Sequence, residues 1–114
     1  MARRKRIFSY ERALALLPEA RRITGEAVDE LEQLLSAETV SEEQLEVPAE
    51  LVPEYQRIVS AWAEAILDMG IEVKGLWLID FDSGAGYYCW RYPEETLEWF
   101  HGYEEGFPGR IKLN

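Results

Sequence analysis

The spacing of hydrophobic residues in the first third of the chain predicts helix. Between residues 10 and 37, apolar side chains recur every three or four positions and share one helical face: Leu14, Leu17, Val28, Leu31 and Leu35. Ser9 is suited to cap the start of this region. Because Pro18 lacks a backbone N–H and clashes with the preceding turn, we expect a short helix near 10–17 and a long one near 19–37.

A second amphipathic helix is expected to begin at Pro53 and to end at Gly70. Its apolar stripe is the most regular in the chain: Tyr55, Ile58, Val59, Trp62, Ala65, Ile66 and Met69. Gly70 can take the left-handed conformation that commonly ends a helix. Residues 38–50, between the two helical regions, are acidic and have no regular period, so they are expected to form a connecting loop.

From residue 71 onward the hydrophobic period changes to two, which indicates β-strands. Residues 71–81 and 87–92 are expected to form two strands joined by a turn. Pro93, with two glutamates behind it, is typical of a helix start, and we expect a short helix that ends near Gly102. The expected fold is therefore α+β: an N-terminal helical hairpin followed by a two-stranded antiparallel β-hairpin and a short C-terminal helix.

An isolated two-stranded hairpin is only marginally stable. Either the helices cover it, or a second copy of the chain extends it, and we expect a homodimer. The 114 residues suit a single domain, 1–114, that can bury its own core. Its first seven residues, which carry four consecutive basic side chains, are expected to form a flexible tail.

Charge and cysteine content narrow the class of protein. The net charge of −10 disfavours nucleic acid as a partner, because such a surface repels phosphate groups. No apolar run approaches the roughly 20 residues of a membrane span. A single cysteine excludes an internal disulfide, zinc fingers and paired-cysteine redox motifs, and it favours a cytoplasmic location.

The predicted C-terminal helix would place several polar side chains on one face. At 100° per residue, Glu94, Glu98, His101 and Glu105 fall close together in angle. The hairpin could bring Asp80 near the same face. Carboxylate oxygens with an imidazole nitrogen suit Zn²⁺, Mn²⁺ or Fe²⁺. The alternative interpretation is a solvated acidic surface beside a hydrogen-bonded histidine.

Several motifs resemble one family of small bacterial proteins, known as domain of unknown function 2203. They are Leu78-Ile-Asp-Phe81, Tyr88-Cys-Trp-Arg91, Glu94, His101 and Glu105-Gly-Phe-Pro-Gly-Arg110, and Phe8-Ser-Tyr-Glu with Leu16-Leu17-Pro18 is similar to the family's start. The sequence departs from the family pattern at Trp77, Pro93 and Phe100. The family's activity is not established, and its members look like metal-binding proteins. The resemblance therefore implies Asp80, Glu94 and His101 as the first metal ligands, with Glu105 next.

Two further residues of these motifs, Cys89 and Arg110, each allow more than one interpretation. Cys89 lies in an aromatic strand and is expected to be a small buried hydrophobic side chain, although a thiolate ligand or a nucleophile paired with His101 remain alternatives. Arg110 is expected either to orient a ligating carboxylate or to form a plain surface ion pair.

The sequence leads to two hypotheses about function. The first is a small cytoplasmic protein that holds one divalent ion, most simply zinc, between carboxylates and its single histidine. The second is a non-catalytic dimeric interaction module without metal. Neither hypothesis identifies a reaction or a small-molecule substrate, and whether the protein is an enzyme is left open.

Overall fold

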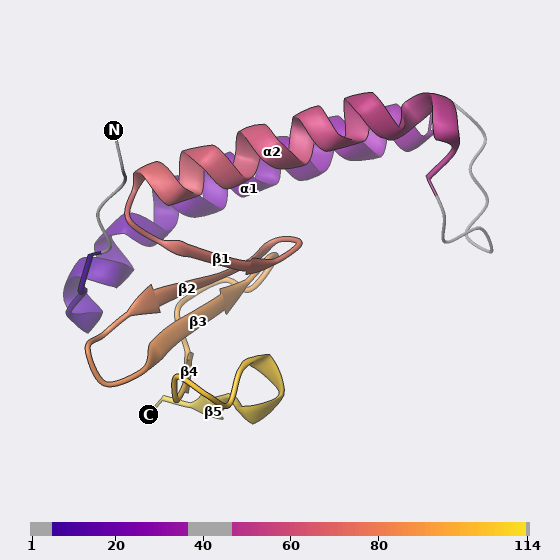
Figure 1. Cartoon of the computed structure of the whole chain (residues 1–114). Coiled ribbons are helices and arrows are strands. Elements are labelled where there is room, and N and C mark those ends of the chain that lie inside the picture. The colour runs from indigo at the N-terminus through magenta and orange to yellow at the C-terminus, as the bar shows by residue number, and fades with distance from the viewer. Residues whose placement is uncertain (1–5, 37–46, 114) are drawn as a thin grey trace.

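Two long antiparallel helices lie against one face of a five-stranded antiparallel sheet (Figure 1). The computed structural model describes residues 6–36 and 47–113. Most of the expected basic tail, residues 1–5, and most of the expected loop, residues 37–46, lie outside the described residues. In the described part of the chain, neither helix combines the length and the apolar character that a membrane span requires.

The first helix, α1, runs without interruption from Tyr10 to Ser36. The expected break at Pro18 is therefore wrong. Leu17 and Ala20, on either side of the proline, are both buried in the core, and we attribute the continuity of the helix to this packing, which offsets the backbone hydrogen bond that proline removes. The expected cap is confirmed, because the backbone N–H of Arg12 donates a hydrogen bond of 3.1 Å to Ser9 Oγ.

The second helix, α2, spans Val52–Asp68 and follows a short 3₁₀ turn at Ala49–Leu51. It ends as expected before Gly70, whose φ is +83°. A buried polar link joins the two helices: Trp62 Nε1 donates a hydrogen bond of 2.8 Å to Thr24 Oγ1, which in turn donates to the carbonyl of Ala20. This link satisfies two polar groups that would otherwise be costly inside the helix pair.

Among the described residues the sheet has five strands in sequence order, so the expectation of a sheet with only two strands is wrong. The strands are β1 (Glu72–Gly75), β2 (Leu78–Asp82), β3 (Tyr87–Arg91), β4 (Trp99–His101) and β5 (Ile111–Lys112). Residues 71–81 were expected to form one strand, but the chain reverses inside this segment at Trp77, which has a φ of +61°. The hairpin between β2 and β3 is confirmed, with Asp82 paired to Tyr87 beside the turn.

The expected C-terminal helix does not form, and β4 lies in its place. Trp90 Nε1 donates a hydrogen bond to the carbonyl of Glu94, and the backbone N–H of Arg91 donates to the Glu94 side chain. Leu97 is fully buried in the core. These contacts hold residues 92–98 in an irregular path, and the ladder with β3 then extends Trp99–His101.

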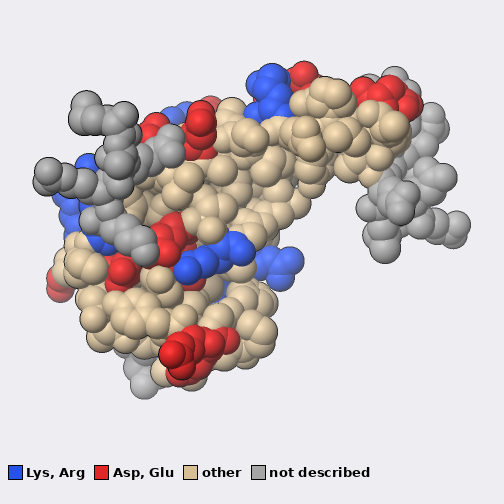
Figure 2. Space-filling model, in the orientation of Figure 1, with Lys and Arg blue, Asp and Glu red and all other residues tan. Residues whose placement is uncertain are grey.

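Alternation along the strands gives the sheet two different faces. Ile79, Phe81 and Trp90 point to the helix side, where they form the core with residues of α1 and α2. Asp80 and Cys89 occupy the intervening positions and therefore lie on the opposite face. Charged groups lie scattered among large uncharged areas on the described part of the surface seen in Figure 2.

The segment after β4 covers part of this second face. Tyr103 packs its ring against Tyr87, with 5.0 Å between the ring centroids. The guanidinium of Arg110 lies 4.6 Å from the centroid of the Trp99 ring, and Trp99 is the direct cross-strand partner of Cys89. Asp80 and Cys89 are therefore shielded from water although the helices lie on the other side of the sheet.

Candidate metal centre

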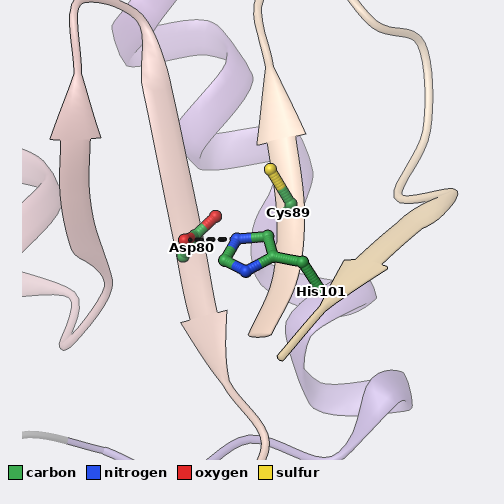
Figure 3. A group of neighbouring side chains, drawn as sticks. All are labelled: Asp80, Cys89 and His101. Atoms are coloured by element: carbon green, nitrogen blue, oxygen red, sulfur yellow. Dashed lines mark hydrogen bonds and ion pairs between the residues drawn. The ribbon is translucent and has the colours of Figure 1, made fainter. Parts of the chain in front are cut away.

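Three adjacent strands bring Asp80, Cys89 and His101 together on the face away from the helices (Figure 3). One potential ligand atom from each residue lies within 4.8 Å of the other two. All three residues are buried, with 1%, 0% and 3% of their surface exposed. An oxygen, a sulfur and a nitrogen donor thus converge in a region that solvent does not reach.

The strand register explains how these side chains meet. Asp80 on β2 is directly opposite Cys89 on β3. His101 on β4 is opposite Tyr87 and therefore diagonal to Cys89. Because β2 and β4 are separated by one strand, their backbones lie about 10 Å apart. The small side chain of Cys89 lets the long imidazole of His101 pass over β3 and reach Asp80.

Both nitrogens of His101 are engaged. Nδ1 lies 2.7 Å from the carbonyl oxygen of Gly102, and Nε2 lies 2.8 Å from Asp80 Oδ2. A carbonyl oxygen can only accept, so Nδ1 carries a hydrogen. A second proton must then lie between Nε2 and Oδ2, because two acceptors would otherwise face each other. The pair is either a neutral acid with a neutral imidazole or a carboxylate with an imidazolium.

The carboxyl group of Asp80 is in an unusual environment. Burial raises its pKa above the ordinary value, and this effect outweighs the opposing influence of the Cys89 thiol and of His101. Oδ1 of the same carboxyl group is buried and, among the described residues, meets no donor in hydrogen-bond geometry, although the Cys89 thiol acts on the carboxyl group as a weak donor. A buried acceptor without a donor is costly, so this oxygen is a position where a ligand would be stabilising.

Cys89 is a protonated thiol at neutral pH. Burial raises its pKa to about 12, the charge of Asp80 adds to this effect, and Arg110 opposes it. A nucleophilic cysteine needs access to a substrate and a nearby base. Cys89 has no exposed surface, and neither nitrogen of His101 is free to accept its proton. The arrangement therefore disfavours Cys89 as a nucleophile.

Glu94 and Glu105 lie outside this three-residue group. Both oxygens of Glu94 accept hydrogen bonds from Arg110 Nη1, at 3.0 and 2.9 Å. Arg110 thus holds a carboxylate, but that of Glu94 and not that of Asp80. Glu105 is exposed, and its side chain packs beside Gly102 and Gly109. The helix that would have aligned both glutamates with His101 is absent.

From the sequence, Asp80 was linked with His101, whereas a thiolate ligand at Cys89 was only an alternative to a buried hydrophobic side chain. Its position inside an aromatic strand indicated a hydrophobic side chain, and Cys89 is indeed fully buried. The available signal was the register of the hairpin. If Asp82 and Tyr87 close the turn, counting back along both strands places Asp80 opposite Cys89.

This fold and cluster define a class of small α+β protein with a buried Asp, Cys and His on the sheet face opposite a helix pair. Residues 6–113 match the model of a family described as an uncharacterized conserved protein (DUF2203), and the chain belongs to that family. The resemblance noted from the motifs is thereby confirmed. Comparison with curated proteins and with solved structures gives no match.

Proposed function

We propose that this protein binds one divalent metal ion, most simply zinc, through Asp80, Cys89 and His101. The observation that carries the proposal is the convergence of three buried donor atoms within 4.8 Å of one another. Zinc takes thiolate, imidazole and carboxylate ligands at about 2.0 to 2.3 Å. The donor atoms of one tetrahedral site are then roughly 3 to 4 Å apart, so modest side-chain adjustments would close the site.

The local hydrogen bonds suit a metal ligand set. A histidine that binds a metal usually donates its other ring N–H to a carbonyl or carboxylate, which fixes the tautomer. The bond from His101 Nδ1 to the Gly102 carbonyl supplies this arrangement and directs Nε2 into the cluster. Asp80 Oδ1, buried and unpartnered, is an oxygen donor that an ion would satisfy.

The charge balance also favours a divalent ion. Without metal, Asp80 and His101 share one proton and Cys89 holds another, so the buried group is neutral overall. With metal, a carboxylate and a thiolate would offset the two positive charges of the ion, and the imidazole would be neutral. Exchange of two protons for one divalent cation therefore leaves no net charge in the interior, where an unbalanced charge would be costly.

Three protein ligands leave one position of a tetrahedral zinc ion for a ligand that the protein does not supply. In this chain, the residues around the ion would fix its position and exclude solvent. The strand backbones hold Asp80 and Cys89 in register, and the Gly102 carbonyl orients His101.

Elemental analysis tests this proposal. The protein is purified without chelators, dialysed against zinc and then against metal-free buffer, and its zinc content is measured. We expect equimolar zinc in the wild type and in the matched controls Glu94→Gln and Glu105→Gln. We expect loss of zinc in Asp80→Asn, Cys89→Ser and His101→Ala. A wild type without stoichiometric zinc would refute the proposal and favour the metal-free interaction module.

A further inference from the structure

Glu72, at the start of β1, has one carboxylate oxygen that no donor reaches. Among the residues that the structure describes, two buried side-chain oxygens have no hydrogen-bond partner, Asp80 Oδ1 and Glu72 Oε2. These two residues are direct cross-strand partners in the β1 and β2 ladder. Directly opposed residues project from the same face of a sheet. Both unpartnered oxygens therefore belong to the face that carries Cys89 and His101.

The other oxygen of Glu72 is held in place by two neighbours. Oε1 accepts a hydrogen bond of 3.2 Å from the Tyr87 hydroxyl and lies 3.2 Å from Lys74 Nζ. The ring of Tyr87 also lies beside the imidazole of His101, with centroids 5.4 Å apart. The Glu72 side chain is only 19% exposed. It is thus fixed at the border of the candidate metal centre with Oε2 free.

We propose that Glu72 is a further residue of this metal site. It would not bind the ion directly, but would stabilise it from beside the three ligands Asp80, Cys89 and His101. Its negative charge would stabilise the cation, and Oε2 would accept a hydrogen bond from the remaining, non-protein ligand of the ion. This inference rests on the proposed function. Mutation of residues that hydrogen-bond to the ligands of a metal typically weakens the affinity of the protein for that metal by about 10- to 100-fold.

Lys74 provides an internal test, because its charge has the opposite sign. The ammonium group lies next to Glu72 Oε1 and 4.3 Å from the Tyr87 ring centroid. It therefore repels a cation bound at the same face while it partly neutralises Glu72. If Glu72 supports the ion, removal of the two charges must alter the affinity in opposite directions.

The experiment measures zinc affinity by competition with a chromophoric chelator for four full-length proteins. Compared with the wild type, we expect Glu72→Gln to bind zinc about 10- to 100-fold more weakly and Lys74→Gln to bind it more tightly. Glu104→Gln, which removes an exposed acid in the turn after β4, should match the wild type. Cobalt spectra of Glu72→Gln should retain the wild-type bands, because the three donor atoms are unchanged.

Each outcome bears on the inference. If the wild type binds zinc and Glu72→Gln binds it equally well, the inference fails while the proposed function stands. Altered cobalt bands in Glu72→Gln would make Glu72 a direct ligand and would also overturn it. If Glu72→Gln does not fold by circular dichroism, Lys74→Gln decides, and unchanged or weaker binding refutes the inference. A wild type that binds no zinc overturns both proposals.

Discussion

His101 and Asp80 share one proton between a ring nitrogen and a carboxyl oxygen in a buried part of the sheet. Nε2 lies 2.8 Å from Asp80 Oδ2. Nδ1 faces the Gly102 carbonyl, which can only accept a hydrogen bond, so Nδ1 carries its own hydrogen and the shared proton lies between Nε2 and Oδ2. His101 Nε2 and Asp80 Oδ2 therefore depend on each other for a hydrogen bond. This mutual dependence allows a structural role of the pair to be separated from metal binding by substitution.

Replacement of Asp80 by alanine or by asparagine should have different effects on the metal-free protein. Asp80→Ala leaves His101 Nε2 buried without a partner, and we expect a loss of about 1 to 3 kcal/mol in the free energy of unfolding. Asp80→Asn can donate its amide N–H to Nε2, so we expect a smaller loss, below about 1 kcal/mol. Urea unfolding with a chelator present measures both values. Equal destabilisation by the two variants would contradict this assignment of protons.

The stability of the metal-free protein should depend on pH through Asp80. Burial raises the pKa of its carboxyl group above the ordinary value of 3.8, so the folded chain binds the proton more tightly than the unfolded chain does. This contribution is complete below the pKa of the unfolded chain and is lost as the pH rises through the raised pKa of the folded chain.

Urea unfolding of the wild type and Asp80→Asn over a series of pH values measures this effect, because the substitution removes the carboxyl group and the proton that it shares with His101 and leaves the more distant titrating groups in place. We expect the difference in unfolding free energy between the wild type and Asp80→Asn to move against the wild type as the pH rises above the ordinary aspartate pKa of 3.8. A difference that moves in favour of the wild type with rising pH would show that Asp80 prefers to be ionised in the folded state.

Cys89 should resist alkylation in the native protein. Burial raises the pKa of its thiol from 9.0 to about 12, which lowers the thiolate fraction at neutral pH by about a thousandfold relative to an ordinary thiol. We expect iodoacetamide to modify the native chain at least about a thousandfold more slowly than the urea-unfolded chain. Mass spectrometry over time gives both rates. Similar rates would mean that the thiol is accessible and ionised.

Glu94 should contribute to stability and not to metal binding. Its two contacts with Arg110 are only partly exposed, at 26% for the Glu94 side chain and 13% for that of Arg110. We expect Glu94→Gln to lower the unfolding free energy by about 1 to 2 kcal/mol, and the exposed control Glu95→Gln to change it by less than about 0.5 kcal/mol. Loss of zinc in Glu94→Gln with the fold retained would restore Glu94 as a ligand.

The periodicity of the sequence was sufficient to predict the helices and one hairpin. Helical stripes of the length of α1 and α2 produce a clear signal, and so does a turn flanked by alternating residues such as that between β2 and β3. The break at Pro18 was predicted wrongly because a local rule was outweighed by burial of the residues around it.

Strands β4 and β5 left no readable pattern in the sequence. β4 spans three residues and β5 two, which is too short to show alternation, and Pro93-Glu94-Glu95 carries the signature of a helix start. At Trp77 a residue with a large side chain adopts a left-handed conformation usually taken by glycine. These positions are determined by pairing between strands, which local propensity does not contain, so local propensity misassigned them.

The candidate site was predicted in part for the same reason. Asp80 and His101 were selected because the chemistry of their side chains suits a metal, and the structure places them in contact. Glu94 was also implied by the family resemblance, and Glu94, His101 and Glu105 were placed together by a helix that does not form. Cys89 joins the group because strand register places it opposite Asp80, a relationship between segments that side-chain composition does not contain.

Titration with Co²⁺ tests the central claim most directly, because a thiolate ligand produces a sulfur-to-cobalt charge-transfer band in the absorption spectrum. We predict that the wild type develops this band and reaches saturation at one equivalent of cobalt. We predict that Cys89→Ser loses the band, and that Glu105→Gln retains it. A saturated spectrum without a thiolate band, or no binding of cobalt by the folded wild type, would contradict a site formed by Asp80, Cys89 and His101.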